Sequence, residues 1–477
     1  MSKVYIAAAF RKHTDRTDKS KAYGVLEDNF HLDFLEKIED IFLNYGFDCC
    51  LPHRDEGDWG KIYFDPAPLS ALCLRHVETS DIIFAIAEES RGVHIELGYA
   101  SAFPNKKIIV LFHKDKEPST LIWGLSNDYT PWKIKSNYGK LIIDSYTNEE
   151  DLFRKVENIL ANKLKLKKLK NNKSRRTIGI IDIGSHTLKL RIYSGSEGTS
   201  ANILYKENAS LGIINEVLSN NIFSENIIID LINQLTIWKE KCITFRCEDI
   251  ILTGTAAFRN AKNTDYLVSK INSEVGLKIQ LLNAEAELDL LYNGVASSMR
   301  TKNKFGVLGL GGGSTQIGVG DNKTAKNKYF LDFGTNLISK KWSWSKPFTK
   351  FEYNTIIHFV EEKFDKQIPF LNDKIDHIVY TGGETEFMLK CHLPLTTFNS
   401  SSIHVSQIDI ESFKQFCFQF ANLHPHEVFE RFHLDPKWAI GAIAANTIAL
   451  VVAQKFSVQY IIPSNFNISE GLILAAK

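Results

Sequence analysis

The stretch TIGIIDIGSHTLKLRIYSG (177–195) consists of two apolar runs joined at a Gly-Ser turn, and FGVLGLGGGSTQIGVG (305–320) repeats this design around a run of glycines. Apolar runs on both sides of a glycine turn predict two paired strands. The same design recurs at long separation. It therefore predicts a duplicated α/β architecture rather than a solenoid of short repeats.

The two turns have the composition of phosphate-binding loops. Successive backbone amides in such a turn form a concave anion site, and glycine lets a phosphate approach the backbone closely. Two such loops in one folded unit are stronger evidence than one. The candidate phosphate-binding residues are Asp182, Gly184, Ser185, Gly311, Gly312, Gly313, Ser314 and Thr315.

Composition sets the limits around these motifs. A chain of 477 residues predicts two to three domains, and 44% hydrophobic with 24% charged residues excludes a disordered or fibrous chain. The net charge of +1 lacks the excess of positive charge that is typical of nucleic-acid-binding proteins, so nucleic acid is not expected as a partner. The seven cysteines include no CxxC, so neither a disulfide framework nor a zinc ribbon is expected.

No membrane or export signal is expected from the sequence. The start of the chain, MSKVYIAAAFRKH, lacks a signal-peptide pattern. The most apolar long segment, residues 439–453, is interrupted by Asn446 and Thr447 and is too short to span a bilayer. We therefore expect a soluble cytoplasmic protein.

The pattern divides the chain into a domain at 1–160, a basic linker at 161–177, and two further lobes at 178–304 and 305–477. Strand-like runs alternate with amphipathic segments in the first domain, which predicts a parallel sheet covered on both faces. The linker carries eight Lys and Arg residues between Lys163 and Arg176, and we interpret it as solvated rather than as a nucleic-acid contact.

A carboxylate follows one of these predicted strands. In ETSDIIFAIAEESRGVHIELGYASAF (78–103), Glu96 lies where a helix is expected to begin. The helix dipole would keep a first-turn carboxylate ionised, and an ionised carboxylate beside a cleft can act as a nucleophile. Ser90 and the backbone near Gly92 can hold an anion. The alternative is that Glu96 only caps the helix.

The first domain resembles the nucleoside 2-deoxyribosyltransferase superfamily, in VYIAAAFRKHTDRT (4–17), LPH (51–53) and the 78–103 stretch. The run S-x-G-V-x-x-E-L-G is closest to the 2'-deoxynucleoside 5'-phosphate N-hydrolase branch. The resemblance implies a Rossmann-like (flavodoxin-like) sheet, with Glu96 attacking C1' of the sugar and Tyr5 orienting it. Cys73 stands where the family has an Asp that protonates the leaving base. The residues implied at the 5'-phosphate are Arg11, His53, Ser90 and Gly92.

The region from 177 to the end resembles the exopolyphosphatase and guanosine pentaphosphate phosphohydrolase (Ppx/GppA) family, whose fold is the two-lobed actin-like ATPase module. The matching segments are IIDIGSHTLKLRI, TGTAAFRNAKN, LLNAEAELDLLYNGV, LGLGGGSTQIGVG, YTGGETEF and ISEGLIL. The resemblance implies that Asp182 approaches metal and phosphate, that Arg259 contacts phosphate, and that Glu287 positions the attacking water. Mg²⁺ is the cofactor that this chemistry implies there, and none is implied for the first domain.

The second loop departs from the family pattern Asp-x-Gly-Gly-Gly-Ser-Thr-Glu. Gly309 replaces the Asp and Gln316 replaces the Glu. The loss of two carboxylates removes metal ligands, which favours a phosphate-ligand-binding module with weakened hydrolysis over a fully active phosphatase.

The predicted function is therefore a nucleotide N-glycosidase that is regulated by a fused sensor of nucleotides or polyphosphorylated ligands. Such a protein would suit bacterial stress response or phage defence, and a homo-oligomer is expected from both resemblances. Two alternatives stay open. In one, the second region is an active exopolyphosphatase or guanosine pentaphosphate phosphatase and the first domain binds nucleotide. In the other, the chain is a non-catalytic, nucleotide-responsive regulator.

Overall fold

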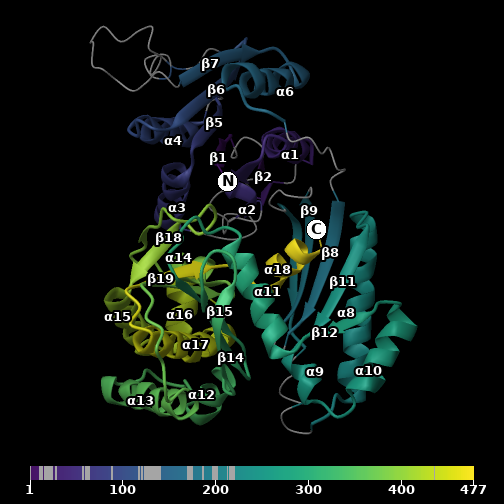
Figure 1. The fold of residues 1–477 in the computed structure, drawn as a ribbon, viewed down its shortest axis with the longest axis vertical. Coiled ribbons are helices and arrows are strands. Elements are labelled where there is room, and N and C mark those ends of the chain that lie inside the picture. Colours follow the sequence, from purple (N-terminus) through teal and green to yellow (C-terminus); the bar gives the residue numbers. More distant parts are fainter. Residues whose placement is uncertain are drawn as a thin grey trace. The chain divides into compact units, whose positions relative to one another are not determined.

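The computed structural model describes residues 2–9, 14–15, 25–26, 29–55, 59, 65–87, 90–116, 119, 122, 141–168, 176–184, 187–195, 202–211, 213, 217, 221–434 and 436–476. The chain folds into two compact units (Figure 1). The first unit contains Met1–Ser174 and the segment Thr397–Val405, and the second contains most of the chain from Arg175 onward.

The first unit is built on five parallel strands in the order β4-β1-β5-β6-β7. The alternation of strands and helices that the sequence predicts for this part of the chain is present, and β7 forms one edge of the sheet. The strands are β1 (Ser2–Ala7), β4 (Phe47–Cys50), β5 (Ile82–Ile86), β6 (Lys107–His113) and β7 (Leu141–Tyr146), with β2 (Thr14–Asp15) and β3 (Val25–Leu26) forming a separate small hairpin.

Helices cover both faces of this sheet because the strand side chains alternate. Val4 and Ile6 of β1 pack with α1 and α6 in one hydrophobic cluster, whereas Tyr5 and Ala7 pack with α3 and α4 in another. Gly46 takes a φ of 81° three residues after α1 ends, a left-handed conformation that glycine adopts readily. The helices are α1 (Asn29–Leu43), α2 (Pro52–Asp55), α3 (Pro66–Thr79), α4 (Arg91–Ser101) and α6 (Glu149–Asn158), which a π-helical turn (Ile159–Lys163) extends.

The second unit contains two sheets that repeat one plan, as the paired glycine turns predict. The five-stranded sheet has the order β10-β9-β8-β11-β12, and the seven-stranded sheet begins β15-β14-β13-β16-β19. In each sheet a central strand pairs antiparallel with the next strand along the chain and parallel with a later one. We call the part around the first sheet the first lobe and the part around the second sheet the second lobe.

The first lobe contains β8 (Arg176–Ile183), β9 (Leu188–Gly195), β10 (Asn202–Ala209), α8 (Glu225–Thr244), β11 (Asp249–Gly254), α9 (Ala256–Asn260), α10 (Thr264–Lys270) and β12 (Ile279–Leu281). The second lobe contains β13 (Phe305–Leu310), β14 (Thr315–Gly320), β15 (Ala325–Leu331), α12 (Thr335–Lys341), α13 (Lys350–Gln367), β16 (His377–Thr381), α14 (Glu384–Lys390), β17 (Thr396–Thr397), β18 (Ser406–Asp409), α15 (Ile410–Ala421), α16 (Pro425–Phe432), α17 (Pro436–Lys455) and β19 (Tyr460–Ser464).

Two helices join the lobes. α11 (Ala284–Ala296) packs on β13, β14 and β15, whereas α18 (Ile468–Ala475) packs on β8, and the two helices contact each other (Figure 1). Their backbones approach closely at glycines, since a Cβ on Gly471 would lie 1.9 Å from the carbonyl oxygen of Leu290. This crossing connects the two sheets.

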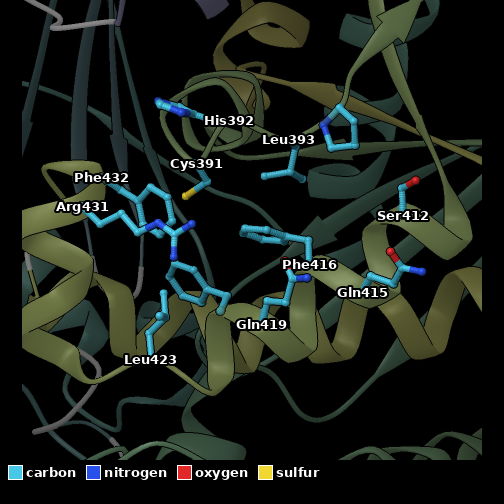
Figure 2. A pocket seen from close by; sticks show the side chains of 12 residues that line it. Cys391, His392, Leu393, Ser412, Gln415, Phe416, Gln419, Leu423, Arg431 and Phe432 are labelled. Atoms are coloured by element: carbon cyan, nitrogen blue, oxygen red, sulfur yellow. The ribbon is translucent and has the colours of Figure 1, made fainter.

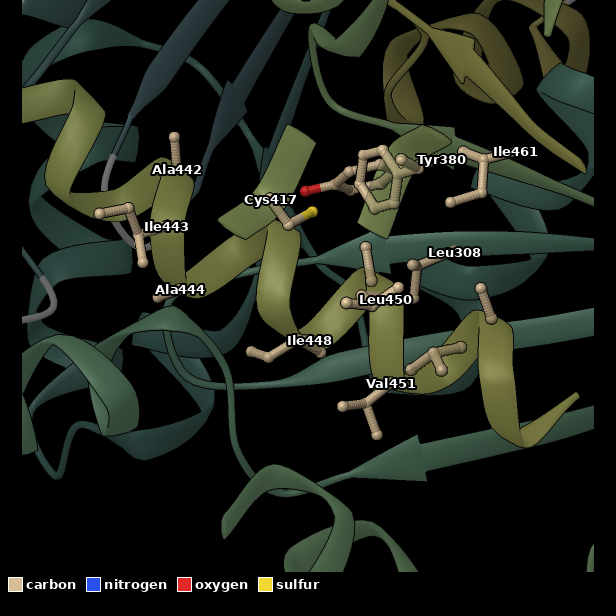
Figure 3. Packing of buried hydrophobic residues seen from close by; sticks show 14 of the residues in the cluster. Leu308, Tyr380, Cys417, Ala442, Ile443, Ala444, Ile448, Leu450, Val451 and Ile461 are labelled. Carbon is tan, nitrogen blue, oxygen red and sulfur yellow. The ribbon is translucent and has the colours of Figure 1, made fainter. Parts of the chain in front are cut away.

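The apolar segment 439–453 lies in α17, the central helix of the second lobe. Ile448, Leu450 and Val451 are fully buried there, beside Leu308 of β13 and Ile461 of β19 (Figure 3). A helix that is apolar all round belongs in a core. Within the described residues, no helix combines the length and apolarity needed to cross a bilayer.

The sheets of the two units confirm the predicted mixed α/β architecture with parallel strands.

Candidate functional site

Asp182 lies near the end of β8, between two partners on neighbouring strands. The strand register places it opposite Lys189 of β9 on one side and Thr253 of β11 on the other. Thr253 Oγ1 lies 3.4 Å from Asp182 Oδ1 and donates a hydrogen bond to it. The hairpin thus brings a cation next to the predicted carboxylate.

The second hairpin repeats these positions with uncharged residues. Gly309 of β13 lies opposite Gln316 of β14 and Thr381 of β16. A Cβ at Gly309 would lie 2.7 Å from Leu291 Cδ2, so a larger residue there would require this side chain to move. The internal repeat therefore places Gly309 where the first hairpin has Asp182, and Gln316 where it has Lys189.

Residues of both hairpins line one cavity of about 350 Å³ in the second unit. The first lobe contributes Asp182, Gly184 and Lys189, and α11 contributes Glu287. The second lobe contributes the glycine loop at residues 311–314. Most of the residues predicted to bind phosphate therefore meet, although they come from distant parts of the chain. The lining also includes Gly309, Gln316, Thr255, Thr381, Gly382 and Asn467.

The glycine loop is held with its amides available. The Gly311 amide donates to Ser314 O at 2.9 Å, and the carbonyls of Gly311 and Gly312 accept from the amides of Thr335 and Asn336 at 3.1 and 2.9 Å. No acceptor in the described part of the chain takes the amide hydrogens of Gly312, Gly313 or Ser314. Such amides form an anion nest beside the cavity.

The loop can fold this way because the residue before α12 is a glycine. A Cβ on Gly334, which precedes α12, would lie 2.2 Å from Gly311 O. Thr315 does not face the cavity. It is fully buried, and its hydroxyl donates to Phe333 O at 2.9 Å, so its role is structural.

Burial changes the charges of the first-lobe pair. It raises the pKa of Asp182 to about 6, an effect that Lys189 opposes and Glu287 reinforces. Burial also lowers the pKa of Lys189 below its ordinary value, while Asp182 acts in the opposite direction. Above pH 6 the cavity therefore holds an ionised Asp182 beside the Lys189 side chain.

Glu287 lies in the first turn of α11 and is held by Arg259 of α9. Arg259 Nη1 donates to Glu287 Oε2 at 3.1 Å and to Leu282 O at 2.6 Å. Arg259 does not line the cavity, so in this arrangement it orients the carboxylate rather than contacting a ligand. Asn283 caps the helix by accepting the Ala286 amide hydrogen, which fixes this first turn.

The donor set of the cavity fits a hard divalent cation. Among the described residues, no cluster of three or more His, Cys, Asp or Glu side chains is present. Mg²⁺, however, needs only one or two carboxylates beside phosphate oxygens and water. Asp182 and Glu287 both line the cavity and can supply them.

The first unit also brings two predicted residues together. Tyr5 OH donates a hydrogen bond of 2.7 Å to Glu96 Oε1. The expected first-turn position of Glu96 is wrong, because α4 begins at Arg91 and places Glu96 in the second turn. The dipole argument for its ionisation, which needs a first-turn position, therefore does not apply. Burial raises the pKa of Glu96 to about 7, although the hydrogen bond from Tyr5 lowers it.

The other residues implied by the first-unit resemblance have different environments. Ser90 caps α4 by accepting the Val93 amide hydrogen at 3.5 Å, and Gly92 is exposed in the first turn. Burial lowers the pKa of His53 to about 4, so this side chain is neutral at pH 7. Arg11 lies outside the described residues, as does Ser185 of the first hairpin turn. Burial raises the pKa of the Tyr5 hydroxyl well above its ordinary value, and the neighbouring Cys73 adds to this rise.

A second cavity, of about 320 Å³, lies in the second lobe between residues 391–394, which follow α14, and the helices α15 and α16. Figure 2 shows Phe416, Gln419 and Arg431 around it, with Cys391 and Leu393 on another side. None of its lining residues is acidic, so it offers neither a metal ligand nor a carboxylate base. The cavity between the glycine loop and Asp182 is therefore the candidate site for phosphate chemistry.

Sequence reasoning missed Lys189. The hairpin register could have predicted its position, because residues at equal distances from a hairpin turn lie opposite each other on the two strands. Counting outward from the turn at residues 184–187 pairs Asp182 with Lys189. The count therefore places a lysine next to a candidate phosphate ligand.

Comparison with known proteins identifies the family that the second unit resembles. Residues 192–476 match the Ppx/GppA phosphatase family. The chain is 24% identical over 396 residues, 78% of this chain and 54% of the relative, to the bifunctional 3-dehydroquinate synthase/phosphatase of Fusobacterium nucleatum. It is 30% identical over 212 residues, 43% of this chain and 40% of the relative, to the guanosine-5'-triphosphate,3'-diphosphate pyrophosphatase of Photobacterium profundum. The chain thus spans about half or less of these curated relatives.

Solved structures share the fold of this unit. The Aquifex aeolicus member of the Ppx/GppA protein family has a TM-score of 0.56 and 22% identity, covering 64% of this chain and 98% of that one. An exopolyphosphatase from Cytophaga hutchinsonii has a TM-score of 0.55 and 17% identity, covering 63% and 97%. The actin-like fold expected for this region agrees with these neighbours. The chain belongs to the Ppx/GppA phosphatase family.

Proposed function

We propose that the second unit hydrolyses phosphoanhydride bonds of a polyphosphorylated substrate in the cavity between its lobes. The observation that carries the proposal is that this cavity combines an amide-rich glycine loop, a carboxylate pair and a lysine. Phosphoryl transfer depends mainly on positioning and on charge stabilisation, and these groups supply both. This ordering reverses the one drawn from the sequence, because the family assignment favours phosphate chemistry over base release.

Each residue has a distinct role in this proposal. The amides of Gly312, Gly313 and Ser314 bind phosphate oxygens, and Lys189 offsets the negative charge of the substrate. Glu287, held by Arg259, orients the attacking water and accepts its proton. Asp182 would hold Mg²⁺, which would supply Lewis-acid polarisation of the phosphate oxygens. Because Gly309 and Gln316 provide no carboxylates, we expect slow turnover.

The substrates to be tested follow from the names of relatives. Polyphosphate corresponds to exopolyphosphatase 1 of Mycobacterium tuberculosis, which is 24% identical over 35% of this chain. Guanosine 5'-triphosphate 3'-diphosphate corresponds to the Photobacterium profundum relative. Phosphate release from each should be measured with the full chain.

The test compares two glutamates of one helix. Glu287→Gln should lower the rate of phosphate release by about 10²–10⁴-fold, the usual contribution of a general base. Glu285→Gln is the matched control, because the Glu285 side chain is 67% exposed and pairs with Lys328 outside the cavity. Equal rates for the wild-type protein and Glu287→Gln would contradict the proposal.

A second candidate function, nucleotide N-glycosidase activity, is favoured by the Tyr5–Glu96 contact in the first unit. We propose it for a sheet whose strand order matches that of flavodoxin-like domains. The nucleophile must be ionised, so release of free base from deoxynucleoside 5'-phosphates should increase as the pH rises through about 7 and should vanish in Glu96→Gln. If neither base nor phosphate is released from any substrate, the non-catalytic regulator is the better account.

A further inference from the structure

α8 ends in a turn that brings two cysteines together. Arg246 adopts a left-handed φ of 54°, and the Cys247 amide donates to Cys242 O at 2.9 Å. The hydrogen bond spanning these six residues is that of a Schellman motif, in which the side chains at its two ends commonly contact each other. In most proteins this contact is between apolar residues. Here both positions are cysteine.

A glycine on the neighbouring strand makes room for both sulfur atoms. A Cβ built on Gly179 of β8 would lie 2.5 Å from Cys242 Sγ and 3.6 Å from Cys247 Sγ. The two sulfur atoms therefore converge over the same backbone position. Cys242 is fully buried, whereas Cys247 is partly exposed and can meet a small solute.

The two thiols also interact electrostatically. The neighbouring Cys242 thiol lowers the pKa of Cys247, an effect that burial opposes. The same pairing raises the pKa of Cys242. The exposed member is thus the one that forms the thiolate more readily, as a reactive cysteine requires.

We propose that Cys242 and Cys247 form an oxidation site in which hydrogen peroxide joins the two thiols as an intramolecular disulfide. The Cys247 thiolate attacks one peroxide oxygen, which forms a sulfenic acid and releases hydroxide that is protonated to water. The sulfur of Cys242 then attacks Cys247 Sγ, and the sulfenic hydroxyl leaves with the Cys242 proton as a second water. Two thiols lose two electrons in total, and one peroxide is reduced to two waters.

The adjacent cysteines of β4 form a contrasting pair. Cys49 packs with the hydrophobic cluster on one face of the first-unit sheet, and Cys50 packs with the cluster on the other face. Successive strand side chains point in opposite directions, so this pair does not present its sulfur atoms to each other. We therefore expect oxidation to select Cys242 and Cys247.

Tryptic mapping of the full chain tests the proposal directly. Trypsin cleaves after Lys241, Arg246 and Arg259, so the two cysteines fall on separate peptides, 242–246 and 247–259. After peroxide treatment, the unreduced digest should contain these peptides linked, with the mass of two hydrogen atoms lost. The protein should also lose two titratable thiols, and reductant should restore both.

Two variants fix the order of the steps. Cys242→Ser should give a sulfenic acid at Cys247 that dimedone captures, and Cys247→Ser should leave Cys242 reduced. Cys73→Ser, which changes a partly exposed thiol of the first unit, should leave the linkage unaffected. The proposal is overturned if the wild-type peptides stay unlinked, or if Cys247 is converted only to the sulfinic acid, at peroxide doses that oxidise other cysteines of the chain.

Discussion

At the scale of single residues, burial rather than sequence position sets the charge of the acidic groups. Desolvation penalises the ionised forms of Asp182 and Glu96, and it therefore raises their pKa values to about 6 and about 7, respectively. Lys189 and, to a smaller extent, the Thr253 hydroxyl limit the rise for Asp182, and the Tyr5 hydroxyl limits it for Glu96. Each carboxyl group can therefore exchange a proton near neutral pH.

The raised pKa of Glu96 predicts a pH-dependent stability difference. The folded protein binds this proton more tightly than the unfolded chain, so the free energy of unfolding of the wild-type protein should fall between pH 4.5 and about 7. Glu96→Gln has no proton to lose there. In urea denaturation, the free energy of unfolding of Glu96→Gln should equal that of the wild-type protein near pH 4. Above pH 7 it should be higher than the wild-type value by about 1–3 kcal/mol.

Tyr5→Phe provides the second arm of this experiment. This substitution removes the hydrogen bond that lowers the pKa of Glu96. The free energy of unfolding should therefore continue to fall up to a higher pH than it does in the wild-type protein. Parallel pH profiles for the wild-type protein, Glu96→Gln and Tyr5→Phe would show that burial does not perturb Glu96.

At the scale of elements, the position of Glu287 depends on how α11 crosses α18. A Cβ on Gly294 of α11 would lie 3.1 Å from Glu470 Cβ, and a Cβ on Gly471 of α18 would lie within 2 Å of Leu290 O. Glycines at both positions allow the helix backbones to touch. The same crossing places the N-terminus of α18 beside the cavity that Glu287 lines.

We expect Gly471→Ala to separate these helices and to lower the free energy of unfolding by about 1–3 kcal/mol. Gly441→Ala in α17 is the matched control, because a Cβ there meets no atom within 4 Å. Gly441→Ala should leave the free energy of unfolding unchanged or raise it by up to about 1 kcal/mol, because alanine has the higher helix propensity. Equal effects of the two substitutions in urea denaturation would contradict the close crossing.

At the scale of the whole second unit, one ligand can link both lobes. Asp182 and Lys189 belong to one sheet and the glycine loop to the other, yet all line the same cavity. A phosphate chain bound there would contact both lobes at once. Binding to the folded state alone should therefore stabilise the two lobes together.

Tripolyphosphate should raise the thermal midpoint of the protein, since a ligand at 100 times its Kd adds about 2.7 kcal/mol of stability. Lys189→Gln should reduce this shift by removing the cation in the cavity. Lys278→Gln, at an exposed first-lobe position outside the cavity, should retain it. The inter-lobe site is wrong if tripolyphosphate stabilises Lys189→Gln and wild-type protein equally.

The sequence alone determined the local features. The hairpins and the alternation of strands and helices follow from apolar periodicity and glycine turns, which act over a few neighbouring residues. Family motifs also predicted Asp182, Glu287 and the 311–314 loop as one group. The tertiary structure decided that Arg259 holds Glu287 instead of lining the cavity, that Lys189 lies beside Asp182, and that Glu96 is half-buried with a raised pKa. These outcomes depend on desolvation and on contacts between distant segments, which exist only after the elements have packed.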